Sequence, residues 1–268
     1  MKGQPLTHIW SEHGDELGIS QRTLYRYIDQ GVLSVGNIDL RRKVAYKPRR
    51  KKKEVSEGFL NQEFRKNRGY DDYLKYMEKH PDTPIIQMDT VKGCREQGKR
   101  LLTLHFCNTN MMLMFLMRDG KADTVVEQFD MLTGLLGLEE FRKVFPVILT
   151  DNGSEFKHTR DLETTEDGKK RTKVFYCDPQ ASWQKPQIEK NHEFIRYVLP
   201  KGKTLNPYTQ EDMLLLANNI NSICRESLGN KSPYEATTDK SILRLMGLMG
   251  LHTVPADEVN LTPALLKR

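Results

Sequence analysis

Residues 145–156 read FPVILTDNGSEF. The apolar residues 145–149 are followed by Thr150 and Asp151, and then by Asn152 and Gly153. A short apolar run bounded by turn residues is typical of a buried strand. Asp151 therefore stands at the exit of a buried strand, which is where α/β proteins gather their ligand sites.

Three more strands and a hairpin are predicted upstream of this segment. Residues 84–93 form one strand, and residues 101–107 and 111–117 form two others. The sequence Asn-Thr-Asn at 108–110 suits a hairpin turn between the last two. The strand at 111–117 is apolar on both faces, so we expect it in the centre of the sheet.

Helices alternate with strands through the rest of the chain. An amphipathic helix is predicted at 124–136, and a strand follows at 173–178. Pro186 starts a helix that runs to about residue 199, and a long helix covers 209–228. This order predicts an α/β fold, a mixed sheet with flanking helices.

The chain has 268 residues and a net charge of +6, and it would be acidic without one basic block. Residues 41–53 (RRKVAYKPRRKKK) hold nine Lys and Arg and no acid. Such a block favours nucleic acid as partner, because neutralised phosphates release counterions. A nuclear or membrane address, or a solubilising linker, is the alternative reading.

Several other classes of protein are excluded. The longest apolar run, Met111–Met117, is far shorter than a bilayer span, so no membrane partner is expected. The 4 cysteines form no CxxC pair, which argues against a structural zinc and a disulfide framework. A reducing cytoplasm is the expected compartment.

Residues 13–33 are predicted to form a helix-turn-helix. Gly18 ends a short helix, and Ser20 caps a second one. The outward face of the second helix carries basic, amide and phenol groups. These candidate DNA contacts are Gln21, Arg22, Tyr25 and Arg26. An ordinary helical hairpin is the alternative.

Three carboxylates stand out by position. Asp89 lies on an apolar strand, Asp151 at a strand exit, and Glu189 in the first turn of the helix that Pro186 starts. A lone carboxylate in an apolar strand is costly unless it is paired or binds a metal. Oxygen ligands suit Mg²⁺ or Mn²⁺, and two such ions can promote displacement at a phosphodiester. The chain has 36 acidic residues, so three ordinary surface acids are the alternative interpretation. Glu193 is a rival to Glu189, and Asp178 or Glu155 could replace one of the three as a metal ligand.

The runs LTDNGSEF, YCDPQASWQKPQIEKNHEFIRYVLPKG and NSICRESLGNKSPYEA resemble the bacterial insertion-sequence transposases of the IS-thirty family. The resemblance covers residues 82–236. It implies a ribonuclease-H-like catalytic core similar to retroviral integrases, with Asp89, Asp151 and Glu189 as catalytic residues and ligands of Mg²⁺ or Mn²⁺. It also implies cleavage at transposon ends and joining of their 3′-OH to target DNA. Double-stranded DNA, with the terminal inverted repeats, and a homodimer or larger assembly are the partners it implies, at the bacterial nucleoid.

The resemblance also bears on residues around the acids. Arg196 matches the family's arginine on the same helix, and His192 is expected to contact DNA or water. Trp183 could stack on a base or anchor packing. The basic block is expected to hold phosphate through Arg49, Arg50, Lys51 and Lys52.

The expected division of the chain has four parts. A helix-turn-helix segment covers 1–40, a basic linker 41–80, the catalytic core 81–236 and a C-terminal tail 237–268, of which the last dozen residues are expected to be loosely held. Family members carry a further helix-turn-helix upstream, so a truncated transposase is expected. The alternative function is therefore a non-catalytic DNA-binding remnant or repressor. A ribonuclease H would share the acids but leaves the helix-turn-helix unexplained.

Overall fold

The computed structural model describes residues 2–40, 63–94 and 98–266. Its centre is a five-stranded sheet in the order β3-β2-β1-β4-β5. β1 (Ile85–Lys92) pairs antiparallel with β2 (Arg100–Phe106), which pairs antiparallel with β3 (Met112–Met117). β4 (Val147–Thr150) and β5 (Lys173–Tyr176) continue the sheet in parallel with β1. This confirms the mixed sheet of the predicted fold class.

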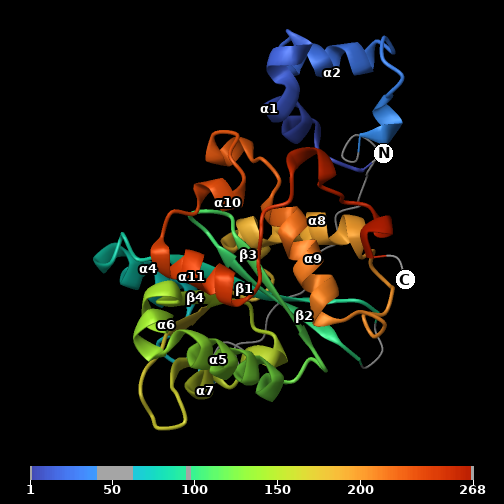
Figure 1. Cartoon of the computed structure of the whole chain (residues 1–268). Helices are drawn as coiled ribbons and strands as arrows, with labels where there is room; N and C mark the ends of the chain where they lie inside the picture. Colours follow the sequence, from blue (N-terminus) through green and yellow to red (C-terminus); the bar gives the residue numbers. More distant parts are fainter. Residues whose placement is uncertain (1, 41–62, 95–97, 267–268) are drawn as a thin grey trace.

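Helices cover both faces of the sheet (Figure 1). α5 (Ala122–Leu136) and α6 (Leu138–Val144) pack on the face to which Ile86 and Met88 point, through a chain of ring contacts from Phe129 to Phe106. α4 (Tyr70–Lys79) packs on the opposite face, where Tyr73 contacts Phe175. α8 (Pro186–Val198) shares that face, since the Ile188 amide donates to the side chain of Gln87.

β3 lies at the edge of the sheet, so its predicted central position is wrong. The apolar side chains of β3 are covered because α9 (Gln210–Asn221) packs against this strand. The Asn221 amide bonds both the N–H and the C=O of Met112, at 2.9 Å each, and Gln210 bonds Leu116 N and Met114 O. These side chains satisfy backbone groups that an edge strand leaves open.

Two further expectations are corrected at the C-terminal end. α9 ends at Asn221 and not at residue 228, because Arg225 pairs with Lys231 in a short bridge instead. The last dozen residues are not loosely held throughout, because Val259 and Leu261 are fully buried in the main core. α11 (Lys240–Leu248) precedes them. Short helices α7 (Thr159–Glu163) and α10 (Pro233–Ala236) complete the fold.

The N-terminal helices α1 (Leu6–Leu17) and α2 (Gln21–Asp29) stand together at one end of the molecule (Figure 1). Gly18 ends α1 with φ of 61°, and the Ser20 hydroxyl accepts a hydrogen bond from Thr23 N, as predicted. His8 is buried: its Nδ1 accepts from Cys224 N, and its Nε2 lies 3.1 Å from Ala256 O. α1 is thereby fixed to the C-terminal part of the chain. None of the helices in the described ranges combines the length and apolar character that a membrane span needs.

Candidate active site

Asp89 and Asp151 are neighbours across two parallel strands. β1 and β4 pair in a register that sets Gln87 beside Leu149. Two residues further along both chains, this register places Asp89 beside Asp151. Alternate residues of a strand share one face, so both carboxylates lie on the α8 side of the sheet.

Each aspartate has one oxygen held by a backbone amide. Asp89 Oδ1 accepts from Thr90 N at 2.7 Å, and Asp151 Oδ1 accepts from Gly153 N at 2.9 Å. The second oxygen of each faces the ammonium of Lys185, at 2.7 Å for Asp89 Oδ2 and 3.5 Å for Asp151 Oδ2. The two carboxylates therefore converge on one cation position.

Lys185 is a site residue that the sequence analysis missed. It precedes the proline that starts α8, and its side chain is only 4% exposed. Burial disfavours its charged form, but Asp89 and Asp151 together outweigh burial and raise the pKa of Lys185. The only signal in the sequence is a lysine directly before a helix start, which a solvated lysine also gives.

Glu189 lies on the first turn of α8, at the rim of this cluster. Burial raises the pKa of its carboxyl, Lys185 lowers it, and Asp89 and Asp151 raise it further. The charges of Lys185, Asp89 and Asp151 thus all act on the Glu189 carboxyl. Glu193 lies one turn further along the same helix, and both glutamates are exposed.

A fourth carboxylate, Glu155, is buried beside Asp151. It accepts a hydrogen bond of 2.6 Å from the Thr90 hydroxyl. A Cβ on Gly153 would lie 2.7 Å from Glu155 Oε2 and 3.1 Å from Asp151 Oδ1, so a side chain there would displace these carboxylates. Glu155 thus stays a rival ligand.

Arg65 contacts the loop that carries Asp151, and it was also missed. It is buried, and its Nη1 donates to the Asn152 side chain and to Cys177 O. Asp178, the other rival acid, lies 3.6 Å from Arg65 Nη2 and accepts from Gln184. Residues 63–68, counted with the linker, therefore support the loop that carries Asp151.

The remaining predicted residues of α8 face two environments. His192 Nε2 lies 2.8 Å from the Thr103 hydroxyl, and burial lowers its pKa to about 3. The predicted contact of His192 with DNA or water stays a prediction. Arg196 is half-buried and donates to Lys92 O at 2.9 Å, while Trp183, before the helix, is 62% exposed.

The predicted DNA contacts of α2 stay predictions. Arg22 and Arg26 are exposed, and Gln21 and Tyr25 are half-buried. The Gln21 amide donates to the Thr7 hydroxyl of α1. Arg49, Arg50, Lys51 and Lys52 lie outside the described residues.

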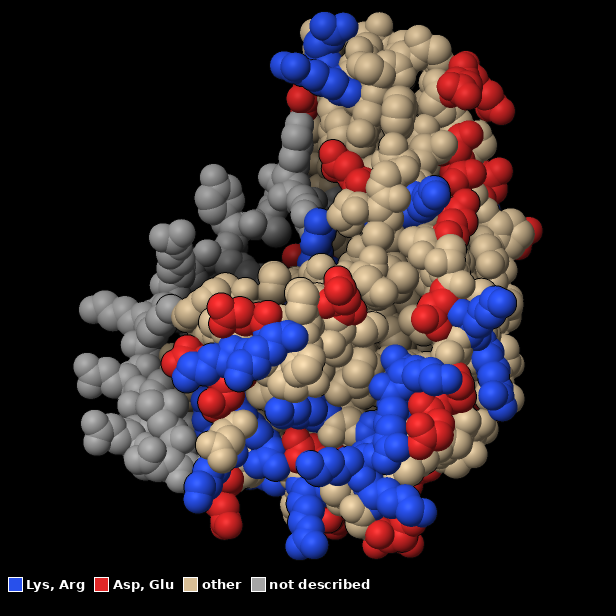
Figure 2. Space-filling model, turned by 90° about the vertical axis from the view of Figure 1, so that its left-hand side faces the viewer, with Lys and Arg blue, Asp and Glu red and all other residues tan. Residues whose placement is uncertain are grey.

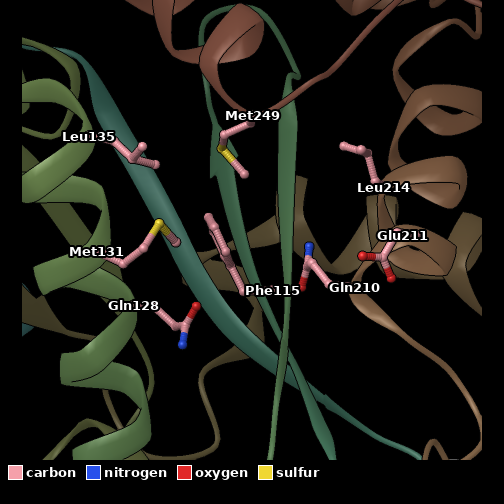
Figure 3. A pocket seen from close by; sticks show the side chains of 8 residues that line it. All are labelled: Phe115, Gln128, Met131, Leu135, Gln210, Glu211, Leu214 and Met249. Atoms are coloured by element: carbon pink, nitrogen blue, oxygen red, sulfur yellow. The ribbon is translucent and has the colours of Figure 1, made fainter.

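Two other features of the described residues lie on the surface and in a cavity. Figure 2 shows basic and acidic side chains interspersed over the lower half of one face. A cavity of about 330 Å³ opens between α5, β3 and α9, where mainly apolar side chains such as Phe115 and Met131 point towards one another (Figure 3). It shares no residue with the acidic cluster and offers Glu211 as its only carboxylate.

The donor set fits a divalent ion. Asp89, Asp151 and Glu189 offer hard oxygen ligands, which Mg²⁺ and Mn²⁺ prefer. The Lys185 ammonium lies at a position where the negative charges of Asp89 and Asp151 stabilise a cation.

No family model matches the chain. It is 24% identical over 220 residues to the transposase for insertion sequence element IS4351 of Bacteroides fragilis, across 81% of this chain and 63% of that protein. It is 25% identical over 202 residues to the probable transposase for insertion-like sequence element IS1161 of Streptococcus salivarius, across 74% and 53%. It is 40% identical over 63 residues to transposase InsI for element IS30A of Escherichia coli K12, across 24% and 16%.

These relatives confirm the predicted similarity to insertion-sequence transposases. The chain spans less than two thirds of the length of each of them. Among solved structures, the catalytic core of BIV integrase gives a TM-score of 0.39 at 18% identity, over 57% of this chain and 92% of that one. A simian T-cell lymphotropic virus intasome bound to PP2A regulatory subunit B56 gamma gives 0.43 at 13%, over 59% and 55%.

Proposed function

We propose that this chain is a DNA transposase of the DDE type, in which Asp89, Asp151 and Glu189 are the catalytic acids. One observation carries the proposal: Oδ2 of Asp89 and Oδ2 of Asp151 converge on one cation position. Glu189 adds its charge at the rim. The similarity to insertion-sequence transposases supports the same reading.

The acids would hold one or two Mg²⁺ or Mn²⁺ ions. Such ions activate the attacking oxygen and stabilise the leaving oxygen of an in-line displacement at phosphorus. The protein supplies position: backbone amides of Thr90 and Gly153 fix one oxygen of each aspartate and leave the other free to bind. Asp89 stands on a strand and Glu189 on a helix, so their separation is set by the packing of α8 on the sheet.

Two displacements of this type would follow one another. Water would attack the phosphodiester at a transposon end, and the bond to the 3′ oxygen would break and release a 3′-OH. That 3′-OH would then attack a phosphodiester of target DNA, forming one ester bond as another breaks. The same three acids can serve both steps because both are displacements at phosphorus.

DNA contacts are proposed on three segments. Arg22, Tyr25 and Arg26 of α2 would bind the duplex, and the basic block would bind phosphate without reading sequence. Arg196 lies on the helix of Glu189 and would contact DNA near the scissile bond. A homodimer or larger assembly in the cytoplasm is proposed, since two ends must be joined.

The test compares wild type with Asp151→Asn on labelled DNA that carries the ends of the element. Asparagine keeps the size of the side chain but removes the charge that binds a divalent ion. We expect nicking and strand transfer in Mg²⁺ by wild type only, and an equal gel shift by both proteins. Glu189→Gln should be inactive and Glu193→Gln active.

Other outcomes have defined meanings. Retained nicking by Asp151→Asn excludes Asp151 as a ligand. A wild type that shifts DNA but never nicks it supports the non-catalytic remnant or repressor. Cleavage of an RNA–DNA hybrid in preference to duplex DNA supports a ribonuclease H.

A further inference from the structure

The most unusual group of the site is a buried cation between the acids. Lys185 has a side chain that is 4% exposed, and its ammonium lies 2.7 Å from Asp89 Oδ2 and 3.5 Å from Asp151 Oδ2. The two aspartates are themselves 17% and 45% exposed. Lys185 therefore faces the oxygens that a metal ion would need.

The negative charges of the neighbouring carboxylates explain the position of the Lys185 ammonium. Asp89, Asp151 and Glu189 are like charges in close proximity, and such charges disfavour one another when nothing lies between them. Taking a lysine out of water is costly unless it is paired. The pairing offsets both costs, because the ammonium is neutralised and the aspartates are screened.

A divalent ion and the ammonium compete for the same atoms. Oδ1 of each aspartate is held by a backbone amide, so Oδ2 is the oxygen left for a cation. One position between two Oδ2 atoms cannot hold both cations. Lysine suits a replaceable cation, since it carries a point charge on a flexible stem.

We propose that Lys185 is the internal counter-ion of the metal site: it holds Asp89 and Asp151 together in the metal-free protein and competes with the divalent ion for their Oδ2 atoms. This inference rests on the proposed function, since it takes the acids as metal ligands. Lys185 is thus a positioning residue that tunes metal affinity.

The experiment measures Mn²⁺ binding by calorimetry and thermal unfolding of the metal-free protein, with no DNA present. Lys185→Met keeps the length of the side chain and removes the charge. Its control is Lys190→Met, an exposed lysine on the same helix. We expect Lys185→Met to bind Mn²⁺ about 10-fold more tightly and to unfold roughly 5–10 °C lower without metal. Saturating Mn²⁺ should remove most of that difference, and the control should match wild type.

Several results would overturn the inference. Equal or weaker Mn²⁺ binding by Lys185→Met would show that Lys185 does not compete, even if the metal-free protein is destabilised. If wild type and both variants bind no Mn²⁺, the metal site of the proposed function is itself wrong. If Lys185→Met does not fold, Lys185→Arg replaces it: the charge is kept, so its Mn²⁺ affinity should equal or fall below that of wild type. Tighter binding by Lys185→Arg would contradict the proposal.

Discussion

Arg65 provides a sharp test of how the loop of Asp151 is held. Its guanidinium is buried, and Nη1 donates to the Asn152 side chain and to Cys177 O. Asn152 directly follows Asp151, so Arg65 connects residues 63–68 to the candidate site. Arg65→Met fills most of the same space without donating any hydrogen bond.

The expected magnitude follows from these contacts. Hydrogen bonds from a charged group contribute about 1.5–3 kcal/mol each, and methionine recovers part of that loss through apolar burial. We expect the free energy of unfolding to fall by about 2–4 kcal/mol. A shift of about 1 Å in the loop of Asp151 would also lower the nicking rate by roughly 10–100-fold.

Arg68→Met is the matched control. Arg68 pairs with Glu163 at 2.7 Å, but its side chain is 29% exposed and the pair does not touch the site. We expect a loss of about 1 kcal/mol and unchanged nicking. Urea unfolding and a nicking assay at a temperature where all proteins are folded measure both quantities. Equal unfolding and nicking by wild type and Arg65→Met would refute the role of Arg65.

Two further predictions concern acid stability and DNA affinity. Burial lowers the pKa of His105 and His192 to about 3, so the unfolded chain binds protons below about pH 6.5 while the folded chain does not. Stability should fall from about pH 6.5 towards pH 3 by up to about 1.4 kcal/mol per pH unit for each histidine, and His192→Gln should be less acid-sensitive in urea unfolding at pH 7 and 5. Charge reversal in the basic block should weaken binding to specific and random duplexes alike and flatten its salt dependence in gel shifts. The residues to reverse are Arg49, Arg50, Lys51 and Lys52, and loss of specific binding alone would contradict phosphate binding.

Local patterns in the sequence predicted most elements of the core. The apolar runs at 84–93, 145–151 and 173–178 become β1, β4 and β5, because each is buried on both faces. The juxtaposition of Asp89 and Asp151 depends in addition on the parallel register of β1 and β4, which pairs Gln87 with Leu149; Asp89 lies within β1, and Asp151 directly follows β4.

The position of β3 depended on partners far along the chain. An apolar strand has the same sequence pattern whether it lies between two strands or at an edge that a helix covers. Asn221 lies 109 residues from Met112, and its amide satisfies the open edge. Nothing local in residues 111–117 indicates that contact.

Lys185 and Arg65 escaped prediction for a related reason. Both look like solvated charges in a basic sequence, and burial gives each its role. Their partners, Asp89 for Lys185 and Asn152 for Arg65, lie 96 and 87 residues away in the chain.

The most direct test of the central claim is a crystal structure of the protein soaked with Mn²⁺, with the ion located by anomalous scattering. We expect a peak within about 2.0–2.3 Å of one oxygen each of Asp89 and Asp151, with Lys185 displaced from between them. Glu189 should complete the protein ligands. A peak bound by Glu193, Glu155 or Asp178 without the two aspartates, or no peak at saturating Mn²⁺, would contradict the claim.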